Sequence, residues 1–98
     1  MPPKFLSLAE VLAIHQDQIA RYGGAAGIRD INLLKSALGM PPATYGGEFL
    51  HTNIYEMASS YLFHLVKNHP FNDGNLRVGA VAAIVLLTSH GFDLQAPQ

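Results

Sequence analysis

The residues whose types and spacing could support chemistry lie together in one segment, HPFNDGNLR, from His69 to Arg77. Pro70 stops a preceding helix, and Gly74 lets the backbone approach a ligand closely. Free amides at the start of a following helix, helped by the helix dipole, attract phosphate. The predicted phosphate-binding set is Asn72, Gly74, Asn75, Leu76 and Arg77.

A carboxylate and a histidine add reactivity to this anion site. Asp73 would repel phosphate unless a divalent cation lay between them, and Mg²⁺ is the natural choice. His69 stands four residues upstream across a turn, where it can accept a proton from an attacking hydroxyl. We therefore predict phosphoryl or nucleotidyl transfer, with His69, Asp73 and Arg77 as the catalytic residues and Asp73 as the metal ligand.

Each of these residues also has a simpler explanation. A histidine just past a helix often only caps it, and Asp-Gly often only forms a turn, so the prediction depends on the combination. The other histidines do not form such a combination and are interpreted as packing or capping residues: His15, His51, His64 and His90.

Capping signals and apolar periodicity predict the elements that position this segment. Four helices are expected, over residues 7–22, 30–38, 53–68 and 75–87. The last is apolar nearly all round, so we expect a buried central helix. Phe71 would pack the segment onto the bundle. The prediction is a single all-α domain over residues 1–98, a compact helical bundle.

Residues 41–52 contain prolines, paired glycines and aromatic side chains, a composition typical of an exposed loop or small hairpin. We interpret this segment, which lies between the second and third helices, as a candidate substrate flap. The flap residues are Tyr45, Gly46, Gly47, Glu48 and Phe49.

Composition limits the function classes. The chain has 98 residues, a formal net charge of −1 and no cysteine. The six Lys and Arg residues are dispersed, which argues against direct nucleic-acid binding. No apolar stretch is long enough to span a membrane, which predicts a soluble protein. The absence of cysteine is compatible with a reducing cytoplasm, and we expect a cytoplasmic protein. With 49% apolar and 13% charged residues, some surface is expected to be covered by a partner.

The segment closely resembles the motif HxFx[DN]GNxR of the Fic/Doc superfamily, and it is most similar to the Doc (death-on-curing) branch. The motif positions are His69, Phe71, Asp73, Gly74, Asn75 and Arg77. Three upstream stretches also look like the opening of Doc-like proteins: RYGG at 21–24, GIRD at 27–30 and LLKSAL at 33–38. The resemblance covers nearly the whole chain.

The resemblance implies a toxin of a toxin–antitoxin module that uses Mg²⁺ and ATP, or another nucleoside triphosphate, to modify a protein hydroxyl. Doc toxins phosphorylate elongation factor Tu and stop translation. An antitoxin of the Phd type would be the partner, with a homo-oligomer as a further possibility. By residue matching, His69 would activate the target threonine, Asp73 would hold Mg²⁺, and Gly74, Asn75 and Arg77 would cradle phosphate.

Departures from the family pattern leave alternatives open. Doc proteins usually have lysine at the position of Leu76, and many have threonine at that of Val78. AMP-transferring Fic relatives usually have glycine at the position of Leu76 and arginine at that of Ala80. Doc-like proteins commonly continue for a further helical segment after the position of Gln98. The alternatives are a degenerate, non-catalytic Doc-fold binding module and an AMP transferase of Fic type.

Overall fold

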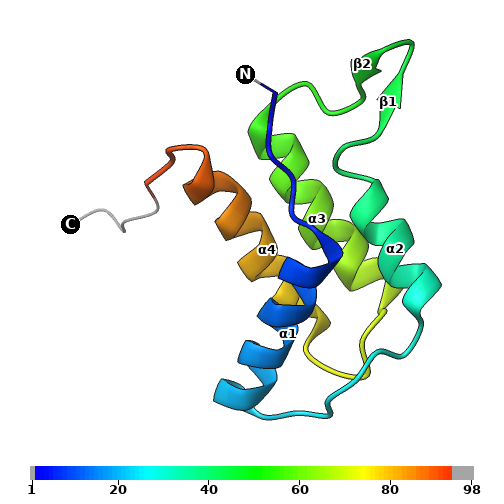
Figure 1. Cartoon of the computed structure of the whole chain (residues 1–98), viewed down its shortest axis with the longest axis vertical. Coiled ribbons are helices and arrows are strands. Elements are labelled where there is room, and N and C mark those ends of the chain that lie inside the picture. Colours follow the sequence, from blue (N-terminus) through cyan, green and yellow to red (C-terminus); the bar gives the residue numbers. More distant parts are fainter. Residues whose placement is uncertain (1, 94–98) are drawn as a thin grey trace.

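The helices begin at capping residues that the sequence marks. The computed structural model describes residues 2–93 (Figure 1). Its helices are α1 (Leu8–Tyr22), α2 (Ile31–Gly39), α3 (Ile54–Asn68) and α4 (Asn75–Ser89). Ser7 and Glu10 form a reciprocal capping box before α1, and the side chains of Asp30 and Asn53 cap α2 and α3. The predicted all-α class and the four predicted helices are confirmed.

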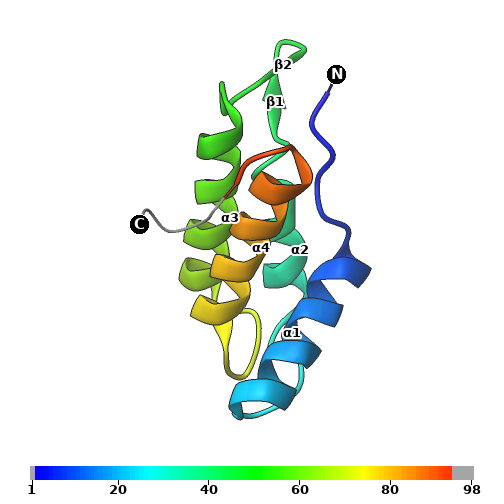
Figure 2. The same ribbon diagram turned by 90° about the vertical axis from the view of Figure 1, so that its left-hand side faces the viewer.

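Helix α4 lies between α1 and α3 (Figure 2), and α2 packs on α3. Helices α3 and α4 approach each other closely at Gly79, where an added Cβ would lie 3.2 Å from the Cα of Leu62. The core of buried apolar side chains consists of Leu6, Val11, Leu34, Ala37, Met57, Ala58, Tyr61, Leu65, Phe71, Val78, Ala82 and Leu86. Phe71 is fully buried, so its predicted role in packing the site loop is confirmed.

Helix α4 is central but buried on one side only. Val78, Ala82 and Leu86 are fully buried, whereas Leu76 is 65% exposed and Ile84 is 46% exposed. The sequence of α4 is apolar nearly all round, but the face that carries Leu76 and Ile84 is exposed. The helix packs mainly against α1 and α3, and this face points toward neither of them.

The predicted loop or hairpin between α2 and α3 is a hairpin of β1 (Thr44–Tyr45) and β2 (Glu48–Phe49). Gly46 and Gly47 both have positive φ, as the tight two-residue turn requires. The hairpin projects beyond the N-terminal end of α3 (Figure 2). Within residues 2–93, no helix is both long and apolar enough to cross a membrane.

Candidate active site

The predicted segment forms a loop that is fastened at both ends. His69 ends α3 in the left-handed conformation, with φ 49° and ψ 54°. The side chain of Asn75 holds the other end: its Oδ1 accepts from the Phe71 amide at 2.9 Å and its Nδ2 donates to the Phe71 carbonyl at 3.0 Å. Residues 69–74 therefore keep a defined path between α3 and α4.

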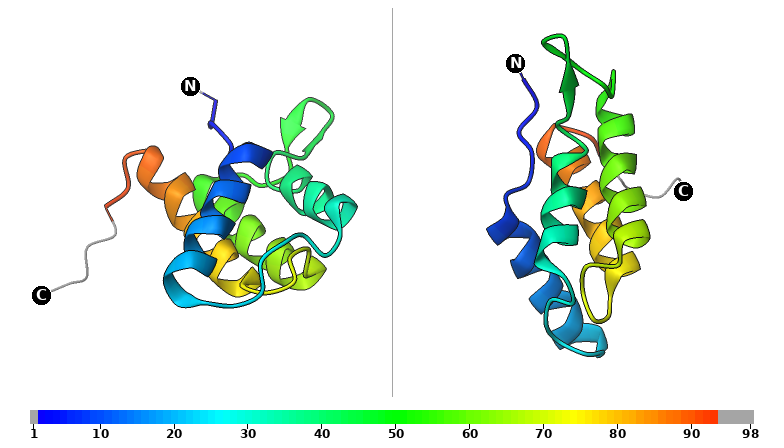
Figure 3. Two further views of the ribbon diagram at one scale, coloured as in Figure 1. Left: turned by 60° about the horizontal axis from the view of Figure 1, so that its bottom comes forward. Right: turned by 90° about the vertical axis from the view of Figure 1, so that its right-hand side faces the viewer.

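A second segment, residues 23–30 between α1 and α2, runs beside the site loop (Figure 3). We call these residues the strap. The Asn72 amide donates to the Gly27 carbonyl at 3.1 Å, and the Asn72 side chain donates to the Ala26 carbonyl at 3.1 Å. Ile28 and Phe71 form an antiparallel bridge. The strap therefore covers one side of the loop with hydrogen-bonded backbone.

Asp73 is exposed and is held as a carboxylate. Its Oδ1 accepts from the Gly74 amide at 2.8 Å and its Oδ2 from the Ala25 amide at 3.3 Å. These amides, with smaller effects of the Arg77 and His69 charges, hold the pKa of Asp73 below its ordinary value. The associated stabilisation is present above the unfolded pKa and is lost as the pH falls through the folded pKa.

Asp73 suits a cation that shares its ligands with phosphate. Residues 2–93 contain no group of three or more His, Asp and Glu side chains arranged for a metal ion. Mg²⁺ commonly uses one or two carboxylates and takes its other ligands from water and substrate phosphates. An ionised, exposed carboxylate beside an uncapped helix start fits that mode of binding.

An open cavity of about 370 Å³ brings together the predicted residues of the 69–77 segment other than Asn72. It is lined by Val66, His69, Asp73, Gly74, Asn75, Leu76 and Arg77. Val66 and Leu76 also line an adjoining apolar groove that continues along α3 past Leu62 and Phe63. The cavity and the groove therefore meet at Val66 and Leu76.

The start of α4 offers fewer donors than the sequence suggests. The Gly74 amide was expected to be free, but it donates to Asp73. The side-chain amides of Asn72 and Asn75 are taken by backbone groups of the strap and loop. Because no side chain caps α4, its first amides, from Asn75 onward, remain open to an anion.

Arg77 lines the same cavity, and two of its guanidinium nitrogens already donate to backbone carbonyls. Its Nη2 donates to the Gly23 carbonyl at 2.9 Å and its Nη1 to the Gln18 carbonyl at 3.4 Å. A guanidinium has five N–H donors, so further donors remain for a phosphate. The two carbonyls fix the position of the charge beside Asp73.

Sequence reasoning missed the part that His15 plays in the loop. His15 is 5% exposed, its ring stacks on Phe71 at 3.9 Å, and its Nε2 lies 2.9 Å from the Asp73 carbonyl oxygen. Because a carbonyl only accepts, Nε2 carries the proton. The interpretation as a packing residue holds, but the packing partner is the site itself. The sequence signal was only a place in the apolar stripe of α1.

Gly24 lies close to two site residues, because a Cβ there would lie 2.6 Å from Asp73 Oδ2 and 3.1 Å from Arg77 Nη2. We expect Gly24→Ala to displace both side chains, which NMR shifts of the Asp73 carboxyl and Arg77 guanidinium groups would report. Gly91→Ala is the matched control, because Gly91 also has positive φ, has nothing within 4 Å and follows the end of α4 remote from the site. Equal perturbation of the site by both variants would show that contact between the new Cβ at position 24 and these two side chains is not the cause.

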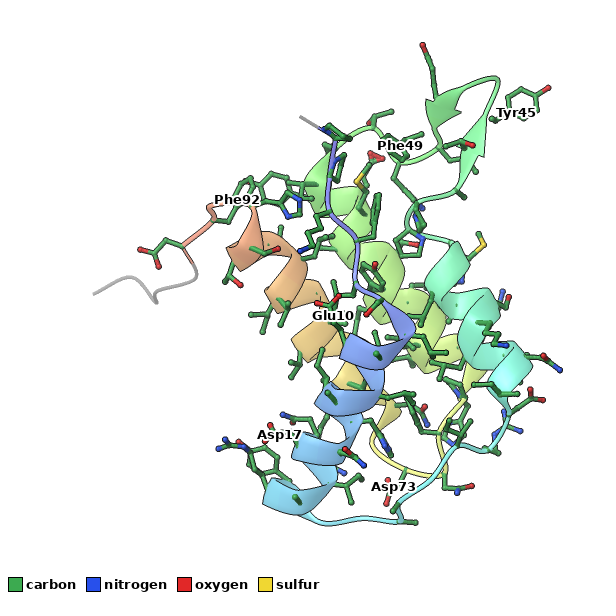
Figure 4. All side chains as sticks on the ribbon, viewed as in Figure 1. Glu10, Asp17, Tyr45, Phe49, Asp73 and Phe92 are labelled. Atoms are coloured by element: carbon green, nitrogen blue, oxygen red, sulfur yellow. The ribbon has the colours of Figure 1, made fainter. Side chains whose placement is uncertain are left out.

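The predicted flap residues lie elsewhere. Asp73 and the hairpin residues Tyr45 and Phe49 are at opposite ends of the molecule (Figure 4). The 15-residue helix α3 separates the hairpin from His69 by roughly 20 Å. Phe49 instead packs against Phe5, with ring centroids 5.7 Å apart. Helix α3 thus separates the hairpin from His69, and the assignment of residues 45–49 as a substrate flap stays a prediction.

Comparisons with known proteins agree with this architecture. Residues 5–87 match the Fic/DOC family, and the chain belongs to this family. It is 31% identical over 91 residues to protein kinase doc of Escherichia phage P1, covering 93% of this chain and 71% of the relative. It is 35% identical over 75 residues to Toxin Doc of Mycolicibacterium smegmatis, covering 76% of this chain and 58% of the relative.

Proposed function

We propose that this chain is a Doc-like toxin that transfers phosphate from ATP, or another nucleoside triphosphate, to a hydroxyl of a protein target. Elongation factor Tu is the proposed target, and inhibition of translation is the proposed outcome. The observation that carries the proposal is the single cavity shared by His69, Asp73, Arg77 and the uncapped start of α4. Similarity to a relative named as a protein kinase supports phosphate rather than AMP as the transferred group.

Each residue then has a distinct task. The exposed imidazole of His69 accepts the proton as the target hydroxyl oxygen attacks the terminal phosphorus. The bond from that phosphorus to the bridging oxygen breaks, and the nucleoside diphosphate leaves. Arg77 and the first amides of α4 hold phosphate oxygens. Asp73 would hold Mg²⁺, which supplies neutralisation of phosphate charge when bound.

The proposed partner is an antitoxin of the Phd type in the cytoplasm. One of the two relatives is named as a toxin. The face of α4 that carries Leu76 and Ile84 is exposed and apolar, as expected of a surface that a partner covers. A homo-oligomer is the alternative occupant of this face.

Incubation with labelled ATP, Mg²⁺ and elongation factor Tu tests the proposed activity. The factor should acquire label, and the adduct mass should correspond to phosphate. A mass corresponding to AMP would show nucleotidyl transfer instead. Absence of any transfer by freshly prepared, antitoxin-free protein would contradict the enzymatic proposal.

A second candidate function, a non-catalytic binding module, is favoured by one observation. Leu76, at the position where Doc proteins usually have lysine, places an exposed apolar side chain at the rim of the cavity. A missing charge-assisted phosphate contact weakens binding about ten- to hundredfold. If the lysine stabilises transition-state charge, the loss approaches the ~10³–10⁵ range of an arginine finger.

Leu76→Lys distinguishes the two functions. For an enzyme, we expect ATP affinity measured by calorimetry to rise about ten- to hundredfold, because a cation is added beside the anion site. Ile84→Lys is the matched control, since it adds the same charge to an exposed position of α4 outside the cavity. Weak ATP binding before the change and none after it would favour the binding module.

A further inference from the structure

Arg29 of the strap contacts three consecutive carbonyl groups at the end of α3. Its Nε donates to the His69 carbonyl at 2.6 Å and its Nη2 to the Asn68 carbonyl at 3.0 Å. Its backbone amide donates to the Pro70 carbonyl at 2.7 Å. The last carbonyls of a helix have no partner within the helix, so these bonds cap α3 from another segment of the chain.

The backbone held in this way is unusual. His69 is the one residue other than glycine with positive φ within residues 2–93. Residues with a side chain rarely adopt this backbone conformation. It persists only where the surrounding structure enforces it. In the part of the chain that is described, no hydrogen bond holds the His69 imidazole itself. The direction of the imidazole therefore depends on the backbone from which it projects.

We propose that Arg29 is a positioning residue for His69, and this rests on the proposed function of His69 as the base. The guanidinium holds the His69 carbonyl and so fixes the left-handed turn that aims the imidazole at the cavity. The backbone of the strap does not take over this role of the guanidinium, because the Arg29 and Asp30 amides both donate to the Pro70 carbonyl. Neither amide reaches His69.

The geometry requires a planar fork rather than a point charge. Two donors of one guanidinium reach the carbonyls of adjacent residues, Asn68 and His69. A lysine ammonium has a compact charge on a flexible stem and lacks this fixed pair of directions. We therefore expect Arg29→Lys, which keeps the charge but not the fork, to hold His69 only partly in place.

The test compares Arg29→Ala and Arg29→Lys with Arg21→Ala in the full chain. Arg21 is an exposed residue of α1 that pairs with Asp17, and such surface pairs contribute little. We expect Arg29→Ala to lower the NMR backbone order parameter of His69 to below about 0.6. Arg29→Lys should give an intermediate value, and Arg21→Ala should match the parent protein. An unchanged order parameter in Arg29→Ala would overturn the proposal.

A kinetic readout separates positioning from general stability. If transfer is detected, we expect Arg29→Ala to lower kcat roughly ten- to hundredfold, since misplacing a reacting group by about 1 Å has such an effect. The KM for ATP should change less than twofold, because Arg29 lies outside the phosphate-binding set. A rise in KM with unchanged kcat would overturn the proposal.

The outcome does not depend on the proposed activity. If the parent protein transfers no phosphate, the proposed function fails, while the order parameter of His69 still decides the role of Arg29. If Arg29→Ala proves too unstable to measure, Arg29→Gln retains a single donor nitrogen and should still loosen His69 relative to Arg21→Ala. Full retention of order in Arg29→Gln would then contradict the need for the fork.

Discussion

Replacing His69 by alanine is expected to lower phosphate transfer about 10²–10⁴-fold, the contribution of a well-placed general base. The side chain is exposed and lines the cavity, so its loss removes a proton acceptor without opening the core. The measurement is kcat with labelled ATP and the proposed target, accompanied by thermal unfolding. We expect the melting temperature to change little.

A second histidine provides the control for this prediction. His51 lies near the hairpin, before α3, and thus at the end of that helix opposite to His69. His51→Ala is expected to leave both kcat and the melting temperature close to those of the parent protein. If both histidine variants lost activity equally, or if His69→Ala retained full activity, His69 would not be the base.

Most of the fold could be predicted because helix ends are local signals. The capping box of Ser7 and Glu10 and the caps Asp30 and Asn53 involve residues only two or three positions apart. Burial around α4 could not be predicted in the same way. An apolar sequence favours burial on every side, but only the arrangement of neighbouring helices decides which side is covered, and Ile84 lies on the other side.

The candidate site also has a part that the sequence predicts and a part that it does not. The loop was recognisable because its proline, glycine, carboxylate and arginine lie within a few residues of one another. The contacts that fix it are distant in sequence: Arg29 and His69 are 40 positions apart, and His15 and Asp73 are 58. The sequence shows that Asn75 has donors and an acceptor, but not that the Phe71 backbone uses them.

The placement of the hairpin follows from the length of α3. Residues 45–49 and His69 flank the single helix α3, so they lie at opposite ends of it whatever their side chains are. A composition suited to an exposed hairpin was correctly interpreted as such. Its composition carried no information on distance from the site, because that distance is set by the helix that follows.

Replacing Phe71 by alanine is expected to have the largest effect on stability, a loss of about 3–5 kcal/mol in the free energy of unfolding. Phe71 is fully buried, stacks on His15 and forms the bridge to Ile28. Native domains are stable by only about 5–15 kcal/mol, so the variant should be close to unfolding. Thermal and urea unfolding would measure the change.

Phe63→Ala is the matched control, because Phe63 is 57% exposed on α3. Its replacement should lower the free energy of unfolding by well under about 1 kcal/mol. Equal destabilisation by the two variants would contradict the assignment of Phe71 to the core.

The Phe71→Ala variant also tests whether Phe71 anchors the site loop. Phe71 lies between His15 and the strap, so the residue that completes the core also holds the loop that carries His69 and Asp73. If so, ATP binding by Phe71→Ala should fall even at temperatures where the helices remain folded, because the loop loses its anchor first.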